Sequence, residues 1–472
     1  MVGHIPAETI KSPPEKFNTS ETDFRRLKRA GLGGITGVLG KGTAIAVSFI
    51  SVPLTVSYLG PERYGVWITI SSFVGWLSVS DVGFGSALNN ALAEAHGLRD
   101  DHLAQGLVST AFWTMCAVAI FIGILALILV PELNWTGILN FEIPTEYAHG
   151  NEVRISIGLA FLFFCLSFPP SLVSPIYNAY QEVHKGNLWA IAGNLISFAA
   201  LLLVVQIRGG LPLLVIALMG STTGVKIVNM IHLCCVERPY LRPILGCFRR
   251  SHFRRLWNLG IFYLVQQIGN IGMFQVQPII LTQMKGPMVV GPFSVAYKLL
   301  SLPQQMLILF LTPLIGAYGE ARVRDDWLWI RRVLLQTIAV SVGLMILTVI
   351  PLAILAPWII PLWAGESMLS DPLTIFWLSL YAVGTSLATP VAMFLQGLER
   401  ARDIATVTIF NGTATIVSSL LLIPTFGVKG MAIAMFISLI IFNCIWQVIL
   451  AAKIVIKFPT DLKKSRNSKN HK

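Results

Sequence analysis

Residues 53–95, PLTVSYLGPERYGVWITISSFVGWLSVSDVGFGSALNNALAEA, contain the end of one long apolar run, a short turn and most of a second run. The turn lies at the Gly-Pro pair of positions 60 and 61, because this dipeptide interrupts regular helix. The second run is interrupted again by the Asp-Val-Gly-Phe-Gly element of residues 81–85. This stretch therefore predicts two consecutive helices, of which the second is broken.

The composition places these helices in a membrane. The chain has 472 residues, of which 54% are hydrophobic and only 12% are charged, whereas a typical soluble domain has about 25% charged residues. Apolar runs of about twenty residues, each long enough to cross roughly 30 Å of hydrocarbon, recur along most of the chain. A transmembrane β-barrel would show short alternating segments instead. We therefore predict an all-α polytopic membrane protein.

The apolar runs predict about twelve transmembrane helices joined by short connections. The expected spans are residues 32–58, 64–93, 105–130, 155–180, 186–207, 211–235, 258–284, 289–317, 333–362, 373–397, 404–425 and 428–456.

The distribution of lysine and arginine predicts the orientation, because cytoplasmic loops are enriched in these residues. Most of the 35 basic residues fall in the connections expected inside, and the expected outer loops contain Arg63, Arg154, Arg208, Lys285 and Lys429. We therefore expect both termini of this multi-pass protein to be cytoplasmic. The positive charge favours contact with anionic membrane lipids. It is not interleaved with exposed aromatic residues, so nucleic acid is not an expected partner.

Several short matches indicate that the second half of the chain repeats the first. Gly60-Pro61 corresponds to Gly286-Pro287, the triplet at 99–101 to that at 324–326, and Ser174-Pro175 to Thr389-Pro390. Because each half contains an even number of spans, the halves would be related by a pseudo-two-fold axis along the membrane normal. The expected segments are a polar and basic N-terminal segment (1–31), a first six-helix bundle (32–235), a basic linker (236–257), a second six-helix bundle (258–456) and a basic tail (457–472).

Four charged residues lie well away from the ends of the expected spans: Lys41, Lys226, Lys298 and Asp81. A charge in a span costs at least about 2.5 kcal/mol and usually faces a wet cavity or a partner. A lysine can alternatively extend its ammonium group to the membrane surface, which we favour for Lys226, whereas we favour a cavity for Lys41 and Lys298. Asp81 is explained equally well by a helix break and by a functional role.

Polar residues accompany these charges at helical spacing. Lys41 shares a face with Ser48 and Thr55, and Gln267, Asn270 and Gln277 form a separate stripe. Such stripes either line a cavity or form hydrogen bonds between helices. The internal repeat would place the stripes of both halves around one central space.

The sequence VPLTVSYLGPERYGVW, followed by DVGFGSALNNALAEA, resembles the first helix pair of the polysaccharide transport family. This family comprises Wzx-type lipid-linked oligosaccharide flippases of the multidrug/oligosaccharidyl-lipid/polysaccharide exporter superfamily. The resemblance implies a protein of the bacterial inner membrane, with two bundles in a V around a central cavity. It also implies a polyprenyl-pyrophosphate-linked glycan as substrate, such as an O-antigen, capsule or exopolysaccharide repeat unit. Such a substrate would be moved from the cytoplasmic to the outer leaflet by alternating access.

This substrate class suggests roles for the polar residues. Lys41 and Lys298 would bind the pyrophosphate as point charges. Gln267, Asn270, Gln277 and Asn89 would form hydrogen bonds with sugar hydroxyls. Asp81 and Lys226 are candidates for ion coupling or gating, with a proton or sodium as the coupling ion. Polymerase or export proteins are candidate partners.

Two other functions fit parts of the sequence. A cation-coupled drug or metabolite antiporter of the same superfamily would share the fold, but cationic substrates require carboxylates where this chain has lysines. A membrane glycosyltransferase or polymerase usually has a larger outer segment than the expected loop at 131–154. No catalytic triad, carboxylate pair or metal-binding cluster is visible in the sequence. We therefore expect no enzymatic activity, cofactor or metal.

Overall fold

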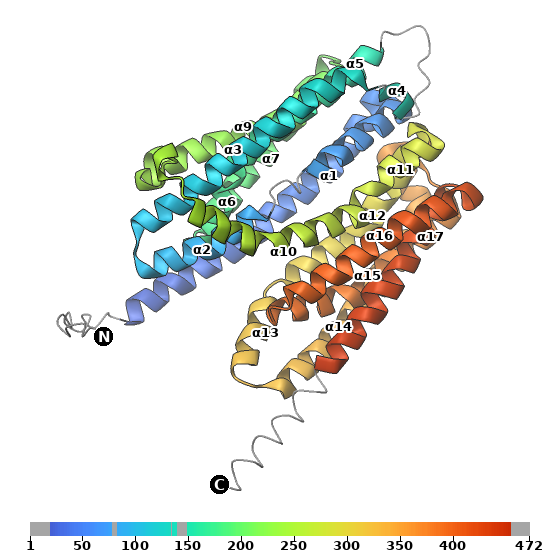
Figure 1. The fold of residues 1–472 in the computed structure, drawn as a ribbon. Helices are drawn as coiled ribbons and strands as arrows, with labels where there is room; N and C mark the ends of the chain where they lie inside the picture. Colours follow the sequence, from blue (N-terminus) through green and yellow to red (C-terminus); the bar gives the residue numbers. More distant parts are fainter. Residues whose placement is uncertain (1–18, 78–82, 134, 139–148, 455–472) are drawn as a thin grey trace, which may run out of the picture.

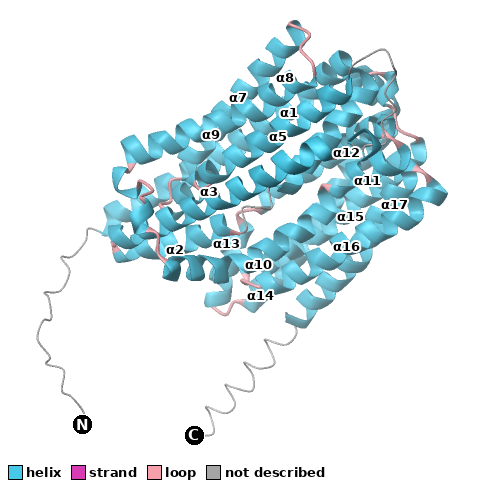
Figure 2. Cartoon of the chain, turned by 45° about the horizontal axis from the view of Figure 1, so that its top comes forward, coloured by secondary structure: helices cyan, strands magenta, loops and turns pink. Residues whose placement is uncertain are grey.

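The computed structural model describes residues 19–77, 83–133, 135–138 and 149–454, and every regular element in these ranges is helical (Figures 1 and 2). The helices are α1 (Thr19–Leu77), α2 (Phe84–Leu98), α3 (Asp101–Glu132), α4 (Trp135–Ile138), α5 (His149–Ser171), α6 (Val173–Ala179), α7 (Val183–Gln206), α8 (Leu211–Val215), α9 (Ser221–His232), α10 (Arg250–Phe274), α11 (Val276–Lys285), α12 (Val290–Leu311), α13 (Leu314–Val323), α14 (Trp327–Ala364), α15 (Pro372–Gly397), α16 (Ala401–Phe426) and α17 (Val428–Ser438). Short π-helical segments follow α8, α9 and α17, the last of which is η8 (Leu439–Trp446).

Ten helical stretches among the described residues are long and apolar enough to cross a membrane. They confirm a multi-pass membrane protein, and they correspond to ten of the twelve expected spans. The expected span 64–93 is divided between the end of α1 and α2, and the expected span 258–284 is divided between α10 and α11. Asp81 lies outside the described residues. These two divided spans do not correspond to each other in the repeat, because 64–93 follows Gly60 whereas 258–284 precedes Gly286.

The backbone confirms the repeat at the two Gly-Pro turns. Gly60 has φ 74° and ψ 170°, and Gly286 has φ 82° and ψ 167°. A positive φ is readily adopted only by glycine, because glycine lacks a Cβ atom. The proline that follows each glycine begins the next helical segment, where its missing N–H is not needed. The same local sequence therefore reverses the chain in the same way in both halves.

A second pair of equivalent turns shows that the sequence match between residues 99–101 and 324–326 is displaced by one residue. Arg99 and Asp325 both have a left-handed backbone. Each is followed by an aspartate whose side chain caps a helix: Asp100 accepts from the Leu103 amide, and Asp326 accepts from the Trp329 amide. The structure thus pairs Arg99 with Asp325, the same separation that relates Gly60 to Gly286, although the triplets suggested a pairing with Arg324. The repeated feature is a helix end and cap, which tolerates a change of residue type.

A third pair of turns lies at Gln181 and Glu399, which also have left-handed backbones. In each turn two consecutive amides donate back to the end of the preceding helix, from Gln181 and Glu182 in one half and from Glu399 and Arg400 in the other. Relative to these turns, Ser174-Pro175 and Thr389-Pro390 do not occupy equivalent positions, although the sequence match paired them. The proline positions differ between the halves, whereas the turn itself is retained.

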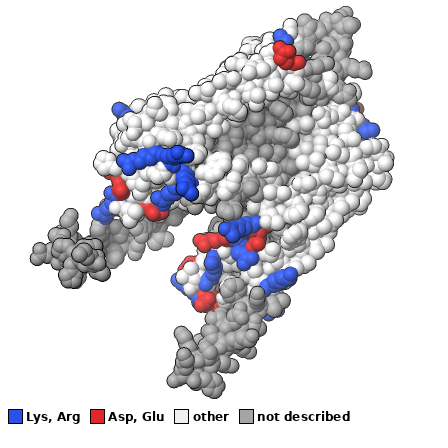
Figure 3. Space-filling model, viewed as in Figure 1, with Lys and Arg blue, Asp and Glu red and all other residues white. Residues whose placement is uncertain are grey.

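Apart from α10, which also packs on α2 and α3, the helices of the two halves lie in separate groups that meet at one end (Figure 1). α1 packs on α7 and α3 on α5 in the first half, while α14 packs on α15 and α16 on α17 in the second. α1 also contacts α11 and α12. At the other end, which carries both termini, the space-filling view is hollowed between the halves, and lysines and arginines gather on both sides of the hollow (Figure 3). We call these the closed end and the open end.

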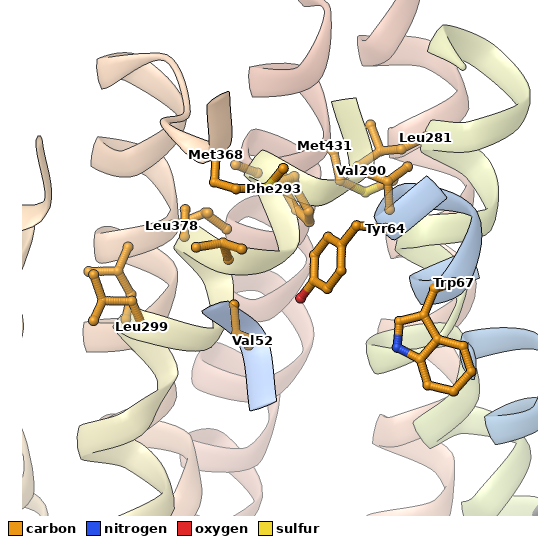
Figure 4. Close-up of a cluster of buried hydrophobic side chains, with 14 of the residues drawn as sticks. Val52, Tyr64, Trp67, Leu281, Val290, Phe293, Leu299, Met368, Leu378 and Met431 are labelled. Atoms are coloured by element: carbon orange, nitrogen blue, oxygen red, sulfur yellow. The ribbon is translucent and has the colours of Figure 1, made fainter. Parts of the chain in front are cut away.

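Apolar side chains from both halves form a shared core at the closed end. Tyr64 of α1, only 3% exposed, lies among Val290 and Phe293 of α12 and Met431 of α17 (Figure 4). These residues belong to one cluster of buried side chains that includes members of both halves. Burial of apolar surface contributes about 25 cal/mol per Å² in water. Within lipid, close packing of this kind is the main stabilising contribution between helices.

The connection between the halves is packed against the first half before α10 begins at Arg250. Arg238 forms an ion pair with Glu182 at 2.9 Å, and the amide of Ile244 donates to the Ser109 hydroxyl of α3. Burial alone would raise the pKa of Glu182, but hydrogen bonds from Arg238 and Lys185 outweigh it and lower that pKa. α10 therefore begins inside the stretch expected as a linker. It then lies against both α2 and α16.

We predict that Gly65→Ala destabilises the protein by about 1–3 kcal/mol, the usual cost of overpacking a filled site. A Cβ atom at position 65 would lie 1.9 Å from the Pro287 carbonyl oxygen, so the halves could not approach as they do. Thermal unfolding in detergent measures the effect. Gly42→Ala on the same helix is the matched control, because no atom lies within 4 Å of its Cβ position. Equal unfolding temperatures for the two variants would contradict this packing.

Candidate functional site

Two side chains of the second half donate hydrogen bonds to consecutive backbone carbonyls of α1 at the closed end. Lys298 of α12 donates from Nζ to the Ser48 carbonyl at 2.7 Å. Trp363 of α14 donates from Nε1 to the Phe49 carbonyl at 3.2 Å. The Trp363 and Phe49 rings also stack, with centroids 3.8 Å apart and planes 10° from parallel. We call this set of contacts the closed-end clasp.

Pro53 explains why α1 offers an acceptor here. A proline has no amide hydrogen, so the carbonyl four residues earlier loses its helical partner. That carbonyl belongs to Phe49, and Trp363 supplies the missing donor. Helix prolines are tolerated in membranes where a neighbouring helix satisfies the freed group. The position of Pro53 in the sequence thus creates a contact between the two halves.

A second polar contact joins the halves beyond the Gly60 turn. The hydroxyls of Thr69 on α1 and Thr282 on α11 lie 2.6 Å apart, and both residues are buried. Each hydroxyl is also within hydrogen-bond distance of a carbonyl of its own helix. Together with the clasp and the Tyr64 core, this contact makes the closed end a continuous interface.

Lys41 lies on the same side of α1 as Ser48, two helical turns or about 10 Å toward the open end. Its side chain is exposed, whereas that of Lys298 is partly buried. Lys298 therefore lies where the two halves meet, and Lys41 lies further along the same side of α1. That both lysines line one substrate cavity stays a prediction.

Lys226 occupies a different position. It is exposed on α9, and α9 packs on α5 and α7 within the first half. Its helix does not reach the clasp, and the choice between membrane anchoring and gating stays a prediction.

The predicted amide residues fall into two groups. Gln267 of α10 and Asn89 of α2 are partly exposed on helices that pack against each other. Gln277 of α11 is buried, with 3% of its surface exposed. The side chain of Asn270 lies outside the described part of the chain. Sugar contacts by these four residues remain a prediction, and the burial of Gln277 favours a contact between helices at that position.

Sequence reasoning missed the residues that complete the clasp and a second polar site. Trp363 is one of four tryptophans in α14, so its type alone does not reveal a partner. The carbonyls of Ser48 and Phe49 are backbone atoms, and only Pro53 pointed to a free acceptor. Asn443 and Gln447, four residues apart in an apolar run, line a cavity in the second half. Their helical spacing was the one available signal.

Comparison with known sequences identifies the family. The family model described as "Polysaccharide biosynthesis protein" matches residues 33–318. The chain belongs to this family.

Two curated members of similar sequence are an O-antigen export protein of Yersinia pseudotuberculosis and an O-antigen transporter of Salmonella typhi, both named as putative. The chain is 22% identical to the first over 49% of its own length and 50% of the relative, and 22% identical to the second over 64% and 67%. It thus spans about half the length of the first and two thirds of the second. The resemblance carried by residues 53–95 to polysaccharide transporters is confirmed.

Solved structures share the fold of this family member. A multidrug resistance MATE transporter of the MOP superfamily in an inward-facing conformation superposes with a TM-score of 0.71 at 14% identity, covering 92% of this chain and 99% of that one. The outward-facing conformation of such a transporter gives 0.66 at 15% identity over 92% and 97%. A MOP superfamily transporter of Pyrococcus furiosus gives 0.65 at 15% identity over 90% and 96%. These likenesses confirm the expected helical membrane fold.

We predict that Lys298→Met loosens the closed end, because a hydrogen bond from a charged group contributes about 1.5–3 kcal/mol. Spin labels at Ser57 and Leu369, both exposed, would report the separation of the halves there in a variant without native cysteines. We expect a longer-distance population at least about tenfold larger than in the parent. Lys453→Met removes an exposed lysine that belongs to none of the proposed sites and serves as control. Identical distance distributions for parent and Lys298→Met would contradict a role for the clasp.

Proposed function

We propose that this protein carries a polyprenyl-pyrophosphate-linked oligosaccharide from the cytoplasmic to the outer leaflet of the bacterial inner membrane. The proposal is supported by the Lys298 contact across the two halves and by the position of Lys41 on the contacted helix. Lys298 of the second half contacts the first half at the closed end, and Lys41 of the first half lies toward the open end on the same side of α1. An anionic headgroup entering between the halves would meet one cation from each.

Lys298 would couple substrate binding to movement. In this structure its ammonium donates to a neutral carbonyl. A phosphate oxygen is a stronger acceptor for an ammonium, because its negative charge adds Coulomb attraction that a neutral carbonyl lacks. A pyrophosphate would therefore draw Lys298 away from Ser48 and weaken the clasp. Such differential binding to two states is what allows a ligand to shift a conformational equilibrium.

The open end gives the direction of entry. It carries both termini and the clustered lysines and arginines (Figure 3), which the positive-inside rule assigns to the cytoplasm. The substrate would enter from the inner leaflet, with its lipid tail remaining in the bilayer. Opening of the closed end would then release the glycan outside. This is alternating access by movement of one half against the other.

The curated relatives support a glycan cargo, since both are named for O-antigen export or transport. These names also favour transport over a glycosyltransferase or polymerase activity. Gln267 and Asn89 on the adjoining α10 and α2 would bind sugar hydroxyls, together with Asn270. A proton or sodium coupled through Asp81 or Lys226, and polymerase or export partners, belong to the same proposal.

A cation-coupled antiporter is the second candidate, because the solved neighbours include multidrug transporters. Those likenesses extend to the fold alone. In the described part of the chain, every acidic residue lies within a few positions of a helix end or of the Gly60 turn, whereas Lys41 and Lys298 lie in mid-helix. A cationic drug would meet like charge between the halves. The charge distribution therefore favours an anionic cargo.

We predict that replacing Lys41 and Lys298 together by glutamine lowers surface glycan at least tenfold, because both cationic partners of the pyrophosphate are lost. The variant would be expressed in a strain without the chromosomal gene. Surface glycan and lipid-linked glycan at the inner leaflet would both be measured, and the latter should accumulate. Protein in the membrane fraction would be compared by immunoblot.

Lys453→Gln is the matched control, since it removes an exposed lysine that belongs to none of the proposed sites. The Lys41→Arg, Lys298→Arg variant should retain partial export, because arginine keeps the positive charge. Normal surface glycan in the glutamine double variant would overturn the role of these lysines. Loss of export without accumulation of lipid-linked glycan would argue against flipping as the affected step.

A further inference from the structure

A cavity of about 280 Å³ lies within the second half, between α12, α15, α16 and η8. It is open on one side, and eight of its lining residues have polar side chains, none of them charged. These polar residues include Gln304, Tyr381, Thr385, Gln396, Asn443 and Gln447. Small-molecule sites in proteins commonly combine apolar walls with a few convergent polar groups in a space of about this size.

One wall of the cavity contains a buried acceptor without a partner. Gln447 is 3% exposed and donates from Nε2 to Asn443 Oδ1 at 2.9 Å. Its Oε1 atom is buried and has no hydrogen-bond partner among the described residues. A buried polar atom of this kind costs about 1–3 kcal/mol if it stays unsatisfied. A ligand that donates a hydrogen bond would remove this cost.

The backbone at this wall is unusual as well. Leu439–Trp446 form a π-helix of eight residues, a conformation that is rare and often found at functional sites. Leu439, Asn443 and Gln447 face the cavity from this segment and its end.

The other walls offer both donors and acceptors. The Thr385 hydroxyl donates to the Ala382 carbonyl at 2.6 Å, which leaves its oxygen free to accept. The side-chain amides of Gln304 and Gln396 supply both kinds of group. Tyr381 adds an aromatic face. Sugar hydroxyls both donate and accept, and sugar rings pack on aromatic faces, so this set matches a neutral sugar.

A cation is a poorer match. Hard cations prefer carboxylate ligands, and no lining residue is acidic. No group of three histidine, cysteine, aspartate or glutamate residues in the described chain could hold a metal ion.

The cavity lies within reach of the proposed pyrophosphate site. α12 carries both Lys298 and Gln304, six residues or about 9 Å apart along the helix axis. Tyr297, next to Lys298 in sequence, also lies near the cavity, with its ring centroid 6.3 Å from that of Tyr381. One sugar attached to a pyrophosphate at Lys298 could extend along α12 to this cavity.

We infer that this cavity binds an uncharged sugar of the lipid-linked glycan, namely one close to the pyrophosphate. The inference rests on the proposed function and adds a substrate preference to it. A neutral hexose or N-acetylhexosamine near the lipid would fit, whereas a uronic acid would bring an unpaired carboxylate into a cavity lined by neutral groups.

The test compares the affinity of two probes for the purified full-length protein in lipid nanodiscs. The probes are polyprenyl pyrophosphate and the same lipid bearing one N-acetylhexosamine. We expect the sugar to improve affinity about tenfold in the parent, the effect of one to two additional net hydrogen bonds. The Gln447→Leu, Thr385→Val variant should lose that gain and keep the affinity for the sugar-free lipid, which also shows that it is folded.

The matched control is the Gln206→Leu, Thr348→Val variant, which makes the same replacements outside the cavity and should keep the gain. Equal binding of both probes to the parent would overturn the sugar site while leaving the proposed function intact. A gain that persists in Gln447→Leu, Thr385→Val would also overturn the site. If neither probe bound the parent, the proposed function would fail, and this inference with it.

Discussion

The missing amide hydrogen of Pro53 is the constraint on which the contact between the halves depends. It leaves the Phe49 carbonyl of α1 without a helical donor, and Trp363 of the second half supplies one. The adjacent Ser48 carbonyl accepts from Lys298. The carbonyl that this proline leaves unpaired in one half thus receives its hydrogen bond from the other half. Because an unsatisfied carbonyl in hydrocarbon is costly, this arrangement is stable but can exchange for another donor when the halves separate.

The internal repeat explains how two halves of different sequence form one interface. Gly60 and Gly286 reverse the chain with nearly the same backbone angles. These turns bring α1, α11 and α12 together at the closed end, where Gly65 lies against the Pro287 carbonyl. Lys41 and Lys298 come from positions that the repeat does not equate, and Lys41 lies about 10 Å along α1 from the Ser48 carbonyl that Lys298 contacts.

Much of the fold followed from elementary rules, and the site followed less well. Hydropathy gave the helices, and Gly60-Pro61 gave the turn, because their causes are local. The pairing of Arg99 with Asp325 was missed by one residue, since a capped turn is retained by geometry and not by residue type. The lysines were found because charge in a span is rare. Trp363, Asn443 and Gln447 were missed because their roles arise from packing between distant helices, which a single sequence does not display.

In the proposed transport cycle, opening of the closed end depends on a competition for Lys298 between the Ser48 carbonyl and a phosphate of the substrate. The most direct measurement is the distance between spin labels at Ser57 and Leu369, recorded with and without saturating polyprenyl-pyrophosphate-linked sugar. We expect the substrate to increase the population with separated labels, and polyprenol without phosphate to leave it unchanged. No change with substrate that is shown to bind, or an equal change with the phosphate-free lipid, would contradict the account.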